Sequence, residues 1–148
     1  MGIVAFLISL LAASSPAPTT AHQAAPARAK GATVMVRKTS YGRILVDGRG
    51  RTLYLFTRDA TPKSRCYGDC AKAWPPLVTK GKPRAGKGAK ASLVATTTRN
   101  GGRRQVTYDG HPVYRYVGDL KPGDVFCQDV NEFGGTWLIV SPSGAAVR

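Results

Sequence analysis

YLFTRD at residues 54–59 occurs a second time, in altered form, as YRYVGD at residues 114–119. Each copy contains a tyrosine, an aromatic residue two positions later and an aspartate three positions after that. The flanking sequence repeats in the same order, with an Asp-Gly pair before each copy and a cysteine, an aspartate and a tryptophan after it. A repeated block indicates one supersecondary unit that is used twice. Residues present in both copies are therefore expected to shape that unit rather than to perform a reaction.

Alternating, β-branched segments predict strands along most of the chain. The predicted strands are residues 33–38, 43–46, 51–56, 92–98, 105–108, 111–116 and 136–141. In the first repeat, residues 43–46 and 51–56 are expected to form a hairpin with a loop of about four residues. In the second, Asp109 and Gly110 lie between two strand-like runs, which predicts a hairpin because a type I′ turn requires positive φ at both central residues. Only residues 70–74 look helical, and Pro75 with Pro76 ends that helix at once.

The sequence therefore predicts a mainly β fold in which two pseudo-repeated hairpin units pack into one small sandwich or barrel-like domain. The repeats span about residues 41–78 and 103–141, and a short helical turn follows the first cysteine pair. The two aromatic residues of each copy lie on one face of a strand, so we expect them to fill a core that the repeats share. Each tryptophan is expected to close its own unit.

The aspartates are expected to fix the turn after each strand, by hydrogen-bonding the backbone two residues on. With the aromatic residues they form a structural motif, which consists of Tyr54, Phe56, Asp59, Trp74, Tyr114, Tyr116, Asp119 and Trp137. The functional alternative for the same residues is an aromatic ligand shelf or an acidic metal site. We favour the structural role because buried aromatic side chains mostly pack.

The first residues predict export. An apolar run from Ile3 to Ala13, followed by small residues, is typical of a secretory signal peptide and too short to span a membrane. We assign residues 1–21 to this signal peptide, residues 22–31 to a disordered linker and residues 32–148 to a single β domain. The apolar run is not followed by a cysteine, so we expect no lipid attachment there.

The formal net charge is +14, and no acidic residue lies between Cys70 and Tyr108. A basic loop at residues 79–91 joins the repeats, and such a positive window attracts anions. The residues expected to bind them are Lys80, Lys82, Arg84, Lys87, Lys90, Arg103 and Arg104. The partner would be an anionic envelope polymer, a membrane surface or an acidic protein, and the alternative is a loop that is only solvated. Nucleic acid is not favoured, because the window lacks interleaved aromatics for stacking.

Three cysteines in an exported chain predict one disulfide and one free thiol. We favour a Cys66–Cys70 disulfide, which leaves Cys127 free and stabilises the fold by about 2 kcal/mol on the chain-entropy model. The rival Cys66–Cys127 disulfide would join repeat-equivalent positions and contribute about 4 kcal/mol on the same model.

Cofactor and catalytic motifs are missing from the sequence. The three cysteines, His111 and Met35 are the soft ligands that would suit copper or zinc. The Cys-x3-Cys spacing differs from the usual zinc pattern, so we assign no metal and no cofactor. A Cys127–His111 nucleophile pair is conceivable, but no hydrolase, metalloprotease or phosphate-loop motif accompanies it, so we assign no catalytic residue.

Taken together, these motifs resemble the secreted-repeat family of predicted bacterial lipoproteins with a Y-x-[FWY]-x-x-D motif. The resemblance rests on both copies of the opening stretch, on CYGDCAKAWPPL at residues 66–77 and on NEFGGTW at residues 131–137. It covers about residues 40–144 and implies an exported bacterial envelope protein, without implying an activity. The chain departs from the family in lacking a lipidation cysteine and in having a cysteine at position 127.

Two classes of function follow from the sequence. The first is a non-enzymatic envelope protein that binds an anionic partner through its basic residues. The second is a small redox or metal-handling protein that uses its cysteines. Binding of the first kind weakens as salt rises, because surface charges are screened. Function of the second kind is lost on Cys→Ser substitution and is insensitive to salt.

Overall fold

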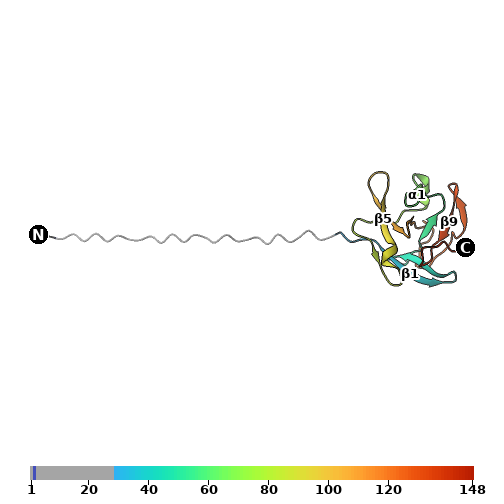
Figure 1. The fold of residues 1–148 in the computed structure, drawn as a ribbon, viewed down its shortest axis with the longest axis horizontal. Coiled ribbons are helices and arrows are strands. Elements are labelled where there is room, and N and C mark those ends of the chain that lie inside the picture. Colours follow the sequence, from blue (N-terminus) through green and yellow to red (C-terminus); the bar gives the residue numbers. More distant parts are fainter. Residues whose placement is uncertain (1, 3–28) are drawn as a thin grey trace.

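The computed structural model describes residues 2 and 29–148 (Figure 1). The predicted signal peptide, apart from Gly2, and residues 22–28 of the predicted linker lie outside the described residues. The fold is mainly β, as predicted. Its strands form three small sheets instead of a closed barrel in the part of the chain that is described. None of the described residues belongs to a helix that is long and apolar enough to cross a membrane.

Each of the three sheets has three strands. The first has the order β2 (Gly42–Asp47), β1 (Thr33–Thr39) and β4 (Arg84–Ala85). The second has the order β3 (Tyr54–Phe56), β9 (Gly135–Ile139) and β8 (Val130–Glu132). The third has the order β5 (Val94–Thr98), β6 (Arg104–Tyr108) and β7 (His111–Pro112). The helix α1 (Asp69–Ala73) and a 3-10 turn, η1 (Ala91–Leu93), complete the fold.

The hairpin between β6 and β7 forms for the reason that the sequence suggests. Asp109 has φ 49° and Gly110 has φ 78°, so both central residues of the turn have the positive φ that a type I′ turn requires. Thr107 then pairs with Pro112, and Tyr108 with His111. Regular pairing stops there. The rest of the predicted strand 111–116 pairs only through single bridges formed by Tyr114.

The two repeats exchange their C-terminal segments. β3 of the first repeat pairs with β9 of the second, with Phe56 opposite Trp137. In the reverse direction, Arg115 N donates to Pro75 O at 2.9 Å and Leu77 N donates to Val113 O at 3.0 Å. Each central segment is thus completed by the tail of the other repeat, a feature that we call cross-repeat pairing.

The centre of the cross-repeat pairing is a reciprocal backbone contact. Tyr54 N donates to Tyr114 O at 2.8 Å, and Tyr114 N donates to Tyr54 O at 2.9 Å. The core is shared in the same way, because one hydrophobic cluster combines Leu45 and Leu53 with Val106 and Val113. The predicted shared core is present, but the two units are intertwined rather than packed face to face.

Residues 29–31, which we assigned to the linker, are among the described residues, and part of the basic loop is a strand. Ala32 N donates to Thr79 Oγ1 at 2.9 Å, and β4 pairs in parallel with the start of β1. Gly31 lies so close to the Lys82 carbonyl that a side chain at position 31 would collide with it. The end of the predicted linker is therefore packed against the loop that joins the repeats.

Candidate functional site

The tyrosines and aspartates of the motif bond across the two repeats. Tyr54 donates its hydroxyl to Asp119 Oδ2 at 2.6 Å, and Tyr114 donates its hydroxyl to Asp59 Oδ2 at 2.7 Å. Both tyrosines are fully buried, so these hydrogen bonds satisfy polar atoms that water cannot reach. The motif is therefore reciprocal, because the aspartate of each copy serves the tyrosine of the other.

The second oxygen of each aspartate orders a long loop. Asp59 Oδ1 accepts a hydrogen bond from Arg65 N at 2.7 Å, and Asp119 Oδ1 accepts one from Phe126 N at 3.1 Å. These partners lie six and seven residues further along the chain, not two as we predicted. The two aspartates occupy equivalent places, and each joins its own loop to the centre of the fold.

The aromatic residues form a stack in which the two tryptophans are in the middle. Trp74 and Trp137 stack at 4.0 Å with an interplanar angle of 3°. Phe56 stacks on Trp137 at 4.2 Å, and Tyr116 lies against Trp74 at 4.8 Å. The prediction that each tryptophan closes its own unit was wrong, because cross-repeat pairing brings the tails to the same place. Both tryptophans are fully buried and present no shelf to a ligand.

Burial changes the acidity of the motif. It raises the pKa of Asp59 and of Asp119 above the ordinary value, because a carboxylate loses solvation in the folded state; hydrogen bonds from Tyr114 and Tyr54 offset part of this effect. The pKa values of Tyr54 and Tyr114 are also raised, mainly by burial. The tyrosines therefore remain neutral donors to the aspartates.

The raised carboxyl pKa values predict that stability depends on pH. Between the unfolded and folded pKa values the folded protein binds more protons, so the contribution of these groups to the free energy of unfolding falls as the pH rises through the folded values. We expect the wild type to gain stability relative to the Asp59→Asn/Asp119→Asn variant when the pH is lowered from 7 towards 4. Urea unfolding at several pH values measures this difference, and a difference that does not vary with pH would contradict it.

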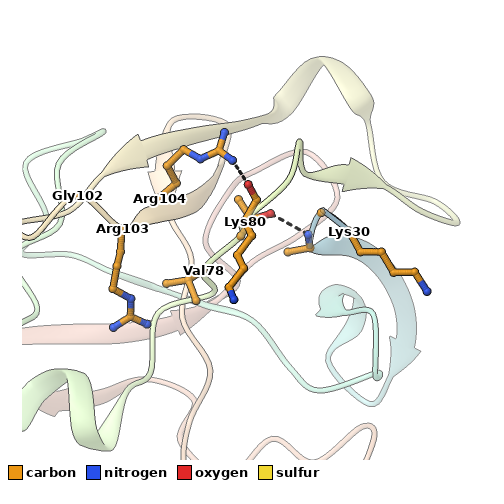
Figure 2. Close-up of a pocket in the computed structure, with 9 residues that line it drawn as sticks. Lys30, Val78, Lys80, Gly102, Arg103 and Arg104 are labelled. Atoms are coloured by element: carbon orange, nitrogen blue, oxygen red, sulfur yellow. Dashed lines mark hydrogen bonds between the residues drawn. The ribbon is translucent and has the colours of Figure 1, made fainter. Parts of the chain in front are cut away.

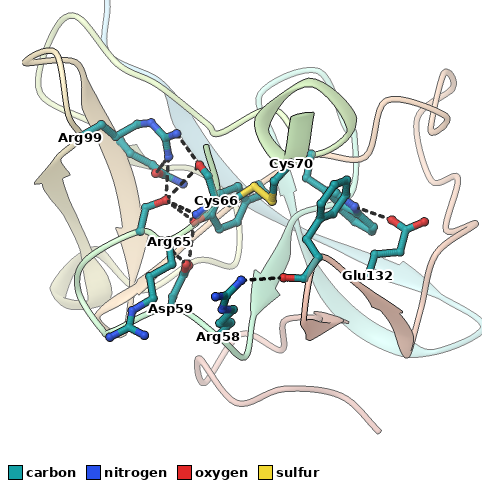
Figure 3. The surroundings of a disulfide bond; sticks show 12 residues. Arg58, Asp59, Arg65, Cys66, Cys70, Arg99 and Glu132 are labelled. Carbon is teal, nitrogen blue, oxygen red and sulfur yellow. Dashed lines mark hydrogen bonds between the residues drawn. A yellow bond between two sulfur atoms is a disulfide. The ribbon is translucent and has the colours of Figure 1, made fainter. Parts of the chain in front are cut away.

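The predicted Cys66–Cys70 disulfide is present, with the two Cα atoms 5.3 Å apart. Arg99 lies beside it and is nearly buried, so it is an internal residue although it belongs to the acid-free window. Its guanidinium donates to Cys66 O at 2.6 Å and to Gln105 Oε1 at 2.7 Å. Figure 3 shows Arg99 beside the disulfide, with its guanidinium directed at the backbone of Cys66.

Cys127 is the free cysteine and is half-buried. Burial raises the pKa of its thiol, while a hydrogen bond with Tyr116 acts in the opposite direction. A raised pKa disfavours the thiolate, which is the form that attacks electrophiles and binds metals. Across residues 29–148, no group of three or more His, Cys, Asp or Glu side chains is placed to hold a metal ion.

Four of the cationic residues line a hollow on the surface (Figure 2). Lys30, Lys80, Arg103 and Arg104 line it, and we call these four residues the basic face. The other lining residues are Gly31, Ala32, Val78, Thr79 and Gly102, none of which is acidic. Arg104 donates to the carbonyl of Lys80, which holds one guanidinium at the rim.

The structure brings together some of the predicted anion-binding residues. Lys80, Arg103 and Arg104 line the hollow. Lys82 and Arg84 line a neighbouring hollow that also includes Lys30.

Neither hollow contains Lys87 or Lys90. Lys30 was missed because it lies in the predicted linker, and its position depends on the packing of residues 29–32 against the loop.

A family model described as a secreted repeat of unknown function, Lipoprotein_15, matches residues 35–78 and 95–141. The two matches coincide closely with the two repeats and together cover more than half of the chain. A search of curated proteins and a search of solved structures found no match.

Proposed function

We propose that this chain, which belongs to that family of secreted repeats, is an exported, non-enzymatic protein of the bacterial envelope that binds an anionic polymer. The observation that carries the proposal is the basic face, where four cations line a hollow and none of the other described lining residues is acidic. Opposite charges on a polymer would be attracted there, and the net charge of +14 strengthens the attraction over longer distances.

The shape of the basic face supports a polymer over a flat membrane surface. The hollow has a volume of about 690 Å³, which is enough for a charged side group of a polymer to enter. Its polar lining groups are lysine, arginine and threonine side chains and backbone amides, with no histidine, carboxylate or thiol to act as a nucleophile or general base. The chemistry of the lining therefore suits binding rather than catalysis.

We expect binding of polyphosphate to depend on the basic face and on salt. The Lys80→Gln/Arg103→Gln/Arg104→Gln variant should bind roughly tenfold or more weakly, and raising NaCl from about 50 to 200 mM should weaken the wild type to a similar extent, because counterions compete for the same charges. Fluorescence anisotropy with labelled polyphosphate measures both effects.

A matched control removes three cations from other exposed positions. Lys38, Lys63 and Lys121 are all exposed and lie outside the hollow, so their replacement by glutamine lowers the net charge equally. Equal losses in the two triple variants would contradict a localised site. Vesicles of anionic lipid and polyglutamate serve as the other probes, and tighter binding to either would point to a membrane surface or an acidic protein instead.

The redox or metal-handling alternative makes the opposite prediction. Under this alternative, Cys127→Ser abolishes function at any salt concentration. Function also does not depend on whether the protein binds polyphosphate. Purified wild-type protein with bound metal or a visible chromophore would favour it.

A further inference from the structure

Three arginines surround one aspartate beside the basic face. Arg49, Arg51 and Arg115 line a third hollow together with Lys30 and Asp47, and we call the three arginines the arginine cluster. They come from both repeats, because Arg49 and Arg51 follow β2 and Arg115 lies inside the second copy of the motif. Cross-repeat pairing therefore assembles this hollow from segments that are far apart in the sequence.

Asp47 does not neutralise the arginine cluster. Its Oδ1 atom accepts hydrogen bonds from the backbone N–H groups of Arg49 at 2.8 Å and of Arg51 at 3.0 Å. Its Oδ2 atom lies 3.3 Å from Arg51 Nε and 3.7 Å from Arg115 Nη1. One oxygen thus faces two guanidinium groups, while the other is occupied by the turn.

The two guanidinium groups are poorly satisfied. Arg51 Nε and Arg115 Nε are buried and have no hydrogen-bond partner among the described residues, since the contact between Arg51 Nε and Asp47 lacks hydrogen-bond geometry. Burial lowers the pKa of Arg115, and the charge of Arg51 lowers it further. The side chains of Arg51 and Arg115 are still 29% and 24% exposed, so a ligand in the hollow can reach them.

We propose that the arginine cluster binds a phosphate group, a proposal that rests on the proposed function because it supplies the point where a phosphate of the anionic polymer is held. Guanidinium groups recognise oxyanions through paired hydrogen bonds. Four cations line the hollow against one carboxylate, which favours a group of higher charge than a carboxylate. This hollow and the hollow of the basic face share the lining residues Lys30, Gly31, Ala32 and Val78, so one polymer can occupy both.

Isothermal titration calorimetry of the full chain with inorganic phosphate tests the proposal. We expect Arg115→Gln and Arg51→Gln each to weaken phosphate binding about tenfold, because each removes a charge-assisted hydrogen-bond donor. We expect Asp47→Asn to tighten it, because asparagine keeps the Oδ1 acceptor for the turn and removes the competing negative charge. Lys63→Gln is the control for loss of one charge elsewhere, since Lys63 is exposed, and thermal unfolding verifies that each variant is folded.

Phosphate affinities within about twofold of the wild type in the two arginine variants and in Asp47→Asn would overturn the proposal, as would equally tight binding of acetate. Its failure is distinguishable from that of the proposed function. If the basic-face triple variant loses polyphosphate while Arg115→Gln retains it, only the phosphate site is wrong. If neither variant affects polyphosphate, the proposed function is wrong as well.

Discussion

Replacing Trp137 with alanine should lower the free energy of unfolding by about 4 kcal/mol, because it removes a large, fully buried side chain and leaves a cavity. Trp137 is in contact with rings on three sides. It stacks between Phe56 and Trp74, and Tyr114 packs edge-on against it with ring centroids 5.1 Å apart. The cavity cannot close easily, because residue 137 belongs to β9 and its backbone is fixed by the pairing of β9 with β3, opposite Phe56.

Urea unfolding followed by circular dichroism measures this loss, and the fluorescence of the remaining Trp74 reports on the same core. Phe126→Ala is the matched control, since Phe126 is 68% exposed and its removal should change stability by no more than about 0.5 kcal/mol. A loss below about 1 kcal/mol for Trp137→Ala would show that the stack contributes little to stability.

Cutting the chain between the repeats should leave the protein folded as one particle. The fragments would still be joined by the reciprocal backbone bonds of Tyr54 and Tyr114, by the ladder between β3 and β9 and by the two tyrosine–aspartate bonds. Because each fragment lacks the tail that completes its own central segment, neither can bury its core alone.

A protease site inserted between Gly88 and Ala89 permits this test on the otherwise complete chain. After cleavage we expect one peak of unchanged size on native gel filtration and two fragments only in denaturant. Each half produced separately should be unfolded by circular dichroism and should fold when the halves are mixed. Two folded halves that separate without denaturant would contradict cross-repeat pairing. Uncut protein carrying the same insertion controls for the effect of the site itself.

Turns, helix ends and short-range links could be predicted from the sequence, because each is determined by residues that are neighbours along the chain. Asp109 and Gly110 can adopt positive φ, so the turn between β6 and β7 was predictable. The helix α1 ends before Pro75, because proline cannot continue it. The Cys66–Cys70 disulfide joins residues four positions apart and required no knowledge of the tertiary fold.

Long-range partners could not be predicted in the same way. Tyr54 bonds to an aspartate 65 residues away, yet the sequence is equally compatible with a bond inside its own repeat, because both copies carry the same motif. The candidate binding site depends on such partners too. Arg115 lies within the second YRYVGD stretch and was not among the predicted anion-binding residues, while Arg99 lies in the acid-free window and is internal. Only the tertiary arrangement distinguishes these arginines from the surface cations.

The reciprocal hydrogen bonds between the repeats have a consequence for the origin of this fold. With the same partners, a chain that carried a single copy of the motif would satisfy its tyrosine, its aspartate and its tail by facing a second identical chain across a twofold axis. Gene duplication would place both partners on one polypeptide and release them from having to remain identical. The differences between the copies fit that history, since Cys66 is bonded to Cys70 in the first repeat while its counterpart in the second, Cys127, is free.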